Sequence, residues 1–181
     1  MSDAQFLEDL RARFNAGKKL KYVFFWGHQA RKNGVTVACF SQWYSAAFIV
    51  DGERYPTAEH YMMAQKAALF GDLETRAQVL QAPNPGAAKA LGRQVRGFDE
   101  ATWVENRFSI VVRANKAKFS QNAELLQFLE QTGSRVLVEA SPVDRIWGIG
   151  VAQNDERVNN PNLWRGLNLL GFALMQVRDG A

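Results

Sequence analysis

Several residue types and motifs are scarce or absent in this chain, and each absence excludes a class of protein. Cys39 is the only cysteine among 181 residues, so the chain cannot form an internal disulfide. The two histidines, His28 and His60, do not have a zinc-binding spacing, and we expect neither metal nor cofactor. No apolar run approaches the ~20 residues of a membrane helix. Residues 1–14 carry charges and lack the apolar core of a signal peptide, which predicts a cytoplasmic location without membrane partners.

The common enzyme motifs are also missing. The sequence contains no Walker-type phosphate loop, no G-x-S-x-G element and no cysteine–histidine pattern of a nucleophilic hydrolase. Gly148-Ile149-Gly150 lacks the third glycine of a dinucleotide fingerprint, and no helix is predicted to begin there. We interpret it as a loop whose backbone approaches another group closely.

The overall composition is that of an ordinary globular protein with a preference for anions. Apolar residues make up 47% and charged residues 22% of the chain. The net charge of +4 and the pI near 9.4 favour phosphates, nucleotides or nucleic acid as ligands. No Lys/Arg block or low-complexity tail adds to the case for nucleic acid.

Periodicity and turn signals predict a mainly α fold with a small β element, of class α+β. We divide the chain into an N-terminal helix with a basic turn, 1–21, and one globular unit, 22–181. A polar loop or hairpin turn is expected at Asn33-Gly34, and a tight hairpin at Asp51-Gly52. Helices are predicted at 4–14, 57–71, 73–80, 86–91, 101–119, 122–130 and from Leu163 or Gly166 to Arg178, and strands at 20–25, 35–40, 47–50, 53–55 and 135–139.

The chain is organised around the stretch from Tyr55 to Lys66. Pro56 should end an extended segment, and Thr57 can cap a helix that begins there. Glu59, Met62, Met63 and Lys66 then share one helix face, with roughly 10 Å between the carboxylate and the ammonium positions. That span suits a small polar ligand. The alternative is that the helix dipole favours Glu59 and that the methionines fill the core.

A second acid, Asp144, lies in an aromatic and glycine-rich loop. Trp103 and Trp147 could stack on a ligand, whereas Arg93, Lys66 and Lys118 could hold an anion. The simpler alternatives are a loop carboxylate paired with Arg145, a core tryptophan, and a solvated cationic face on the helix over 101–119.

Several segments together resemble the NADAR superfamily of YbiA-like N-glycosidases, over nearly the whole chain from Tyr22 to Arg178. The most specific are the Thr57-x-Glu59-His60-Tyr61 block and Asp144-x-x-Trp147-Gly148-x-Gly150. The chain differs from the short bacterial form in two respects. The connection between Trp26 and Ser41 is longer, and Ile149 stands where an acidic residue can occur in that form. The other segments that carry the resemblance are 24–28, 41–44, 91–93, Trp103, 117–119 and 168–171.

The resemblance implies a YbiA-like single domain that hydrolyses N-glycosidic bonds to ribose. Its active-site acids and tryptophan would fall on Glu59, Asp144 and Trp103. Three functions stay open: cleavage of phosphoribosylamino-pyrimidine intermediates of riboflavin synthesis, removal of ADP-ribose from guanine in nucleic acid, and ADP-ribose binding without catalysis. The matching segments add further substrate-binding residues, namely Phe25, Gly27, His28, Gly148, Gly150 and Asn168.

Glycoside chemistry then assigns roles to the two acids. Glu59 would stabilise positive charge at C1 of ribose and activate water, and Asp144 would help the base to leave. In a variant of this mechanism Lys66 attacks C1 of an opened ribose and forms a Schiff base.

Overall fold

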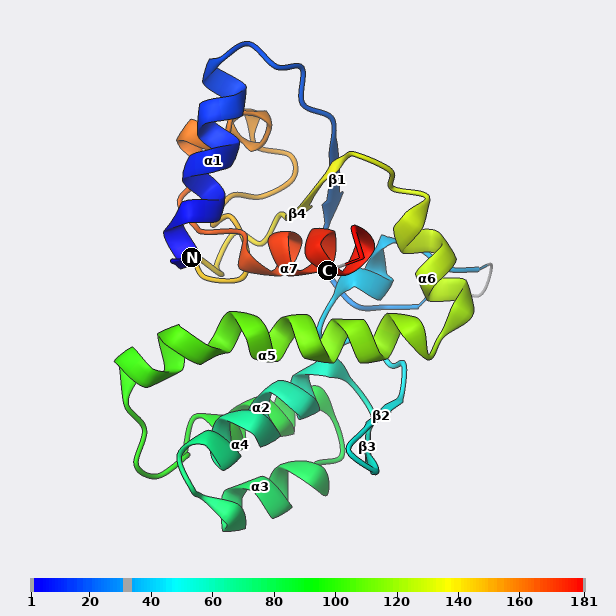
Figure 1. The fold of residues 1–181 in the computed structure, drawn as a ribbon, viewed down its shortest axis with the longest axis vertical. Coiled ribbons are helices and arrows are strands. Elements are labelled where there is room, and N and C mark those ends of the chain that lie inside the picture. Colours follow the sequence, from blue (N-terminus) through cyan, green and yellow to red (C-terminus); the bar gives the residue numbers. More distant parts are fainter. Residues whose placement is uncertain (1, 31–33, 181) are drawn as a thin grey trace.

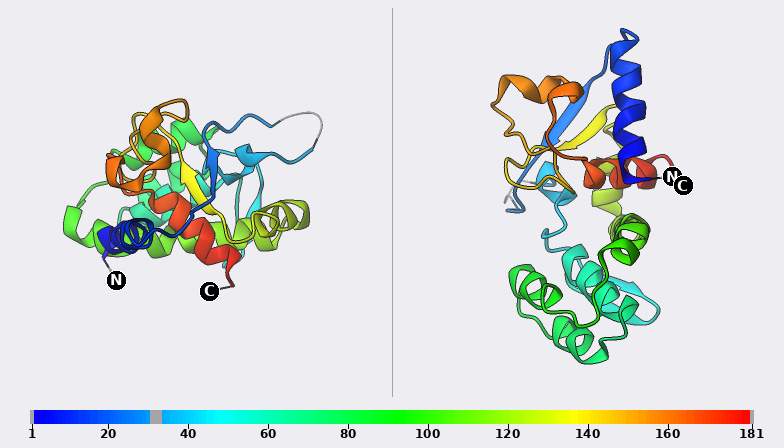
Figure 2. Two further views of the ribbon diagram at one scale, coloured as in Figure 1. Left: turned by 90° about the horizontal axis from the view of Figure 1, so that it is seen from above. Right: turned by 90° about the vertical axis from the view of Figure 1, so that its left-hand side faces the viewer.

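The computed structural model describes residues 2–30 and 34–180. The long helix α5 (Glu100–Ser120) runs through the middle of the molecule (Figure 1). On one side lie α2 (Ala58–Leu69), α3 (Leu73–Leu80), α4 (Pro85–Gly92) and the hairpin β2–β3 (Phe48–Val50, Glu53–Tyr55). On the other side lie α1 (Asp3–Asn15), β1 (Tyr22–Phe25), β4 (Val136–Glu139) and α7 (Leu169–Arg178). Figure 2 shows the same division from the side. The class is α+β with helices dominant, as predicted.

Several helices begin at a capping residue that the sequence shows. Thr57 accepts the amide of His60 at the start of α2, and Asp99 accepts that of Thr102 at the start of α5. The 3₁₀ helices η2 (Glu156–Asn159) and η3 (Pro161–Leu163) are capped in the same way, by Asp155 and Asn160. Helix α6 (Ala123–Glu130) begins without a side-chain cap. None of the helices in the described ranges is long and apolar enough to cross a membrane.

The last helix begins later than predicted. Residues 161–163 form η3 rather than the first turn of α7, which starts at Leu169. Asn168 precedes it in the left-handed region, with φ of 57°. Its side chain donates to the Leu137 carbonyl and accepts the Glu139 amide, so contacts with β4 fix where the helix begins.

The predicted strand over 35–40 is wrong. Residues Val37–Phe40 form the 3₁₀ helix η1, capped by the side chain of Thr36. Consecutive burial of Ala38, Cys39 and Phe40 does not fit the alternation of a half-buried strand. Strand β1 pairs instead with the distant β4, in parallel. Gly34 is described, but Asn33 of the predicted turn lies outside the described residues.

The predicted hairpin before α2 is confirmed. Strands β2 and β3 pair antiparallel, with Phe48 opposite Tyr55. Asp51 and Gly52 both have positive φ, 53° and 80°, as a type I′ turn requires.

The cationic side chains of helix α5 are less exposed to solvent than the sequence predicted. Lys118 is fully buried, and its Nζ donates to the carbonyls of Cys39 and Ser41 at 2.6 and 2.9 Å. Arg107 is buried too and pairs with Asp3 of α1 at 2.7 Å. The predicted solvated face is therefore wrong at these two positions.

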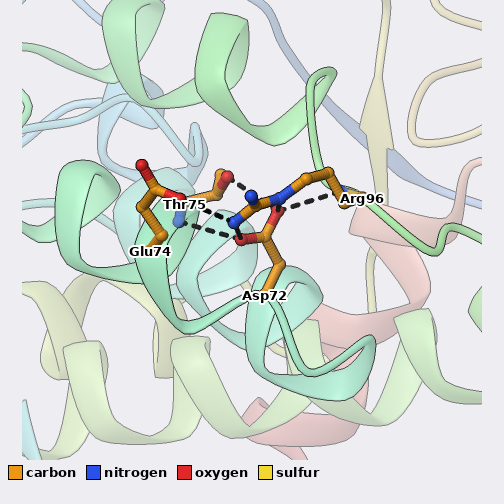
Figure 3. Close-up of polar contacts among 4 residues, drawn as sticks. All are labelled: Asp72, Glu74, Thr75 and Arg96. Carbon is orange, nitrogen blue, oxygen red and sulfur yellow. Dashed lines mark hydrogen bonds and ion pairs between the residues drawn. The ribbon is translucent and has the colours of Figure 1, made fainter.

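A polar cluster ties the segment after α4 to the start of α3 (Figure 3). The buried carboxylate of Asp72 caps α3 through Thr75 and accepts hydrogen bonds from the backbone and the guanidinium of Arg96. The guanidinium of Arg96 also reaches Glu74. Because α2, α3 and α4 pack together, this cluster helps to hold the end of α4 beside α2.

Candidate active site

A cavity of about 190 Å³, here called the inner cavity, opens between the two sides of the molecule. Helices α2 and α4 supply one wall, and the end of β4 with the loop after it supplies another. Its lining residues are Ser41, Gln42, Trp43, Glu59, Met62, Met63, Lys66, Lys89, Gly92, Arg93, Trp103, Glu139, Asp144, Trp147 and Leu170.

All four residues of the predicted α2 face line this cavity: Glu59, Met62, Met63 and Lys66. Close packing of α4 on α2 keeps that face in place, because a Cβ added at Gly92 would lie only 2.0 Å from the Met63 sulfur. The carbonyl of Gly92 also accepts a hydrogen bond from Lys66 Nζ at 2.9 Å.

Glu59 is 3% exposed and sits in the first turn of α2. Burial raises the pKa of its carboxyl to about 7, although Lys89 and the indole N–H of Trp43 favour the charged form. Nearby Asp144 raises it further. A carboxyl group that titrates near neutral pH is suited to acid–base chemistry.

Asp144 is held by its own loop. Its Oδ1 accepts amide N–H groups from Ile146 and Trp147 at 2.8 Å each, and its amide donates to Ser141 Oγ. These bonds fix the direction of the carboxyl group, which lines the cavity together with Glu59. The fold thus brings the two predicted acids to one cavity.

Glu139, the last residue of β4, is a third carboxyl on this cavity and was not predicted. Burial raises its pKa to about 8, with smaller contributions in the same direction from Asp144 and Glu59. The sequence signal that could have found Glu139 is the alternation of side chains between the two faces of the strand. Glu139 shares a strand face with Leu137 of the main core, so an acid stands where an apolar residue would pack.

Unpartnered polar atoms gather at this cavity. Five buried side-chain atoms have no hydrogen-bond partner among the residues that the structure describes. Three of them belong to cavity-lining residues: Gln42 Nε2, Glu59 Oε1 and Glu139 Oε2. Burying such groups without partners is costly, so their concentration in one place points to a polar ligand that completes their bonds.

Cations and indoles surround these acids. Lys66, Lys89 and Arg93 line the inner cavity. Burial lowers the pKa of the Lys66 ammonium, whose Nζ lies 4.3 Å from the Phe98 ring centre and 5.6 Å from that of Trp103. Trp103 and Trp147 also line the cavity, as predicted stacking residues should. Trp43 lines the cavity too and was not predicted as a site residue, although it belongs to the segment 41–44 that carries the resemblance.

A second hollow of about 440 Å³, here called the outer cavity, adjoins the first. It contains the predicted residues Gly27 and His28, and His28 packs against Trp43 with 5.5 Å between ring centres. Five residues line both cavities: Ser41, Trp43, Lys89, Glu139 and Asp144.

Five other predicted residues line neither of these two cavities. Phe25 is buried against Phe40 in the core. Lys118 is engaged by backbone carbonyls and does not face the ligand space. Asn168 ties α7 to β4 and shapes the wall indirectly.

Gly148 and Gly150 serve the Asp144 loop itself. A Cβ at Gly148 would lie 2.9 Å from the Glu139 carbonyl, and Gly150 has φ of +64° while its amide donates to the Asp144 carbonyl. The loop therefore needs glycine at both places for its own packing.

No group of three or more potential metal ligands occurs in residues 2–30 and 34–180. Ser41, Gln42 and Lys89 also line the inner cavity and were not selected as site residues. Ser41 and Gln42 belong to the segment 41–44 that carries the resemblance, which is the signal that could have found them. Lys89 belongs to no such segment and reaches the cavity through the packing of α4 on α2.

Comparison with known proteins gives consistent matches. The model of the NADAR domain matches residues 24–180. N-glycosidase R617 of Acanthamoeba polyphaga mimivirus is 46% identical over 165 residues, which are 88% of this chain and 95% of that protein. The maize riboflavin biosynthesis protein PYRR is 35% identical over 132 residues, or 69% of this chain and 19% of that protein.

A solved structure supports the same relationship. The chain is similar to the NMR structure of Escherichia coli YbiA, with a TM-score of 0.71, 28% identity, and coverage of 90% of this chain and 85% of that one. By sequence, N-glycosidase YbiA is 32% identical over 140 residues, which are 77% of this chain and 79% of that protein.

Proposed function

Because the chain belongs to the NADAR domain family, we propose that it is an N-glycosidase that hydrolyses the bond between ribose and a base. The observation that carries the proposal is the set of unpartnered polar atoms and carboxyl groups around one cavity. N-glycoside cleavage builds positive charge on C1 and the ring oxygen of ribose, and fixed carboxylates stabilise that charge.

Glu59 is the carboxyl group assigned to this charge. It lines the inner cavity only, so a ribose bound there lies beside it. With a pKa near 7 it can take a proton from the water that attacks C1. We assign Asp144, whose carboxyl group is fixed by two amides, a hydrogen bond to the ribose or to the leaving group. Arg93 and Lys89 supply positive charge for a phosphate.

For the substrate we propose a phosphoribosylamino-pyrimidine of riboflavin biosynthesis. The N-glycosidase names of the mimiviral and bacterial relatives and the name of the maize relative support this choice. The test is product analysis on the free phosphoribosylamino-pyrimidine and, side by side, on an oligonucleotide with ADP-ribosylated guanine. Release of ribose 5-phosphate and pyrimidine from the first alone supports the proposal. Cleavage of the second alone assigns the substrate to nucleic acid, and tight ADP-ribose binding without cleavage of either overturns the enzymatic proposal.

Lys66 offers a covalent variant of the same reaction. Its amine lines the cavity, and burial lowers its pKa, which increases the fraction present as a nucleophile. In an opened ribosylamine the Lys66 amine adds to C1, the pyrimidine amine leaves, and water hydrolyses the resulting Schiff base. Borohydride during turnover should trap the sugar on Lys66. Peptide mapping without any adduct, or an adduct that persists in Lys66→Arg, rejects the covalent route.

A further inference from the structure

Glu139 and Asp144 both stand where the inner and outer cavities meet, whereas Glu59 belongs to the inner lining alone. A substrate with its sugar in the inner cavity and its base in the outer cavity has its glycosidic nitrogen at this junction. We therefore compare the two carboxyls found there as the group that protonates the leaving base.

The backbone holds Glu139 firmly at the junction. Its amide donates to Asn168 Oδ1 at 3.0 Å, and its carbonyl accepts the Ile149 amide at 3.0 Å. As the end of a strand paired with β1, it is better fixed than a side chain on a free loop. The main chain of Glu139 is therefore fixed at the junction of the two cavities.

The two junction carboxyls differ in their bonds. Oδ1 of Asp144 already accepts two amide N–H groups. Oε2 of Glu139 is buried and has no partner within the described part of the chain. The charged groups that face Glu139 are Glu59 from α2, Asp144 from the loop after β4 and Lys89 from α4. Burial and the two negative neighbours raise the pKa of Glu139 to about 8, so it keeps its proton at neutral pH.

On the basis of the proposed N-glycosidase function, we propose that Glu139 is the general acid that protonates the leaving nitrogen of the base. This is the task that the sequence assigned to Asp144. The O–H bond of Glu139 breaks and an N–H bond forms, while the electron pair of the C1–N bond passes to the nitrogen. Water adds to C1 and gives a proton to Glu59, and exchange with solvent returns the proton to Glu139. If Lys66 attacks in place of water, the leaving nitrogen needs the same proton.

The decisive experiment varies the basicity of the leaving group. Rates on N-(5-phosphoribosyl)anilines, corrected for spontaneous hydrolysis, are compared for the wild type, Glu139→Gln, Glu139→Asp and Glu105→Gln, which alters an exposed acid on α5. For basic amines Glu139→Gln should lose about 10²–10⁴-fold, the usual contribution of a general acid. The loss should shrink steadily toward 4-nitroaniline, which leaves more easily. Glu139→Asp should recover part of the rate, and Glu105→Gln should match the wild type. An equal loss on every amine would assign Glu139 a merely structural role.

A second readout uses the pyrimidine substrate itself. Because the acid must be protonated, the wild-type kcat should fall as the pH rises above about 8, and Glu139→Gln should lack this fall. A fall that persists in Glu139→Gln overturns the assignment of the acid while the glycosidase proposal stands. A wild type that releases no amine or pyrimidine from any of these substrates overturns both.

Discussion

Replacing Glu59 by glutamine should make the protein more stable while it removes activity. The carboxyl group is 3% exposed, and its pKa is raised from 4.5 to about 7 by burial. Glutamine keeps the shape and has no charge to desolvate. The structure therefore predicts that Glu59 is kept at a cost in stability, as is common at active sites.

The magnitude and its pH window follow from proton linkage. Below pH 4.5 the folded and unfolded chains both hold the proton, so the acid costs nothing extra. As the pH rises from 4.5 to 7, the unfolded chain loses the proton first, and stability falls by 1.36 kcal/mol per pH unit. The loss amounts to about 3 kcal/mol at pH 8. For a chain of this length, that corresponds to roughly 6–12 °C in Tm.

The assay is the difference in Tm between the wild type and Glu59→Gln at pH 4.5 and at pH 8, with kcat measured alongside. The difference should be small at pH 4.5 and reach roughly 6–12 °C at pH 8, with kcat lower by about 10²–10⁴-fold. Because both proteins contain Glu139, whose pKa is higher at about 8, the Tm difference between them limits the contribution of Glu139 to the result. Glu105→Gln is the matched control. A Tm difference that does not depend on pH would refute the burial argument, and near-normal kcat would refute the catalytic role.

Three further predictions concern groups around the site. Asp72→Ala should lower Tm at pH 7. Arg96 and Thr75 hold the pKa of the Asp72 carboxyl far below 3.8, so this carboxylate stabilises the wild type above about pH 4, and the wild type loses that stability as the pH falls further. The Tm difference between the wild type and Asp72→Ala should thus narrow toward pH 2. A Tm difference that stays constant with pH would argue against this role of the Asp72 carboxylate. Gly92→Ala should reduce kcat/KM by pushing Met63 into the inner cavity, and the added change Met63→Ala should restore much of it; a stability loss without a kinetic one contradicts this. Lys118→Met should lower Tm and leave KM unchanged, whereas a raised KM would return Lys118 to the phosphate site.

Local signals in the sequence were sufficient wherever a short segment determines its own structure. Thr57 and Asp99 start their helices by capping them, and Asp51-Gly52 makes its hairpin because both residues accept positive φ. The face with Glu59 and Lys66 followed from helical periodicity alone, since the helix itself sets that spacing.

The failures have a common cause in long-range contacts. Nothing near β1 indicates that its partner is β4, more than a hundred residues later, so the strand over 35–40 was predicted as its neighbour. Lys118 looked like a solvated or anion-binding cation because the carbonyls that accept from it belong to residues 39 and 41.

The sequence by itself determined most of the helices, the hairpin, the family and the choice of Glu59 and Asp144 as candidate acids, because each depends on residues a few positions apart or on a recognisable block. The start of α7 instead depends on the contacts of Asn168 with β4. Only the tertiary structure decided that Glu59, Asp144 and Glu139 face one cavity, and that burial raises the pKa of Glu139 there. Burial and the distances between charges set the protonation of an acid, and both arise when α2, α4 and β4 pack together.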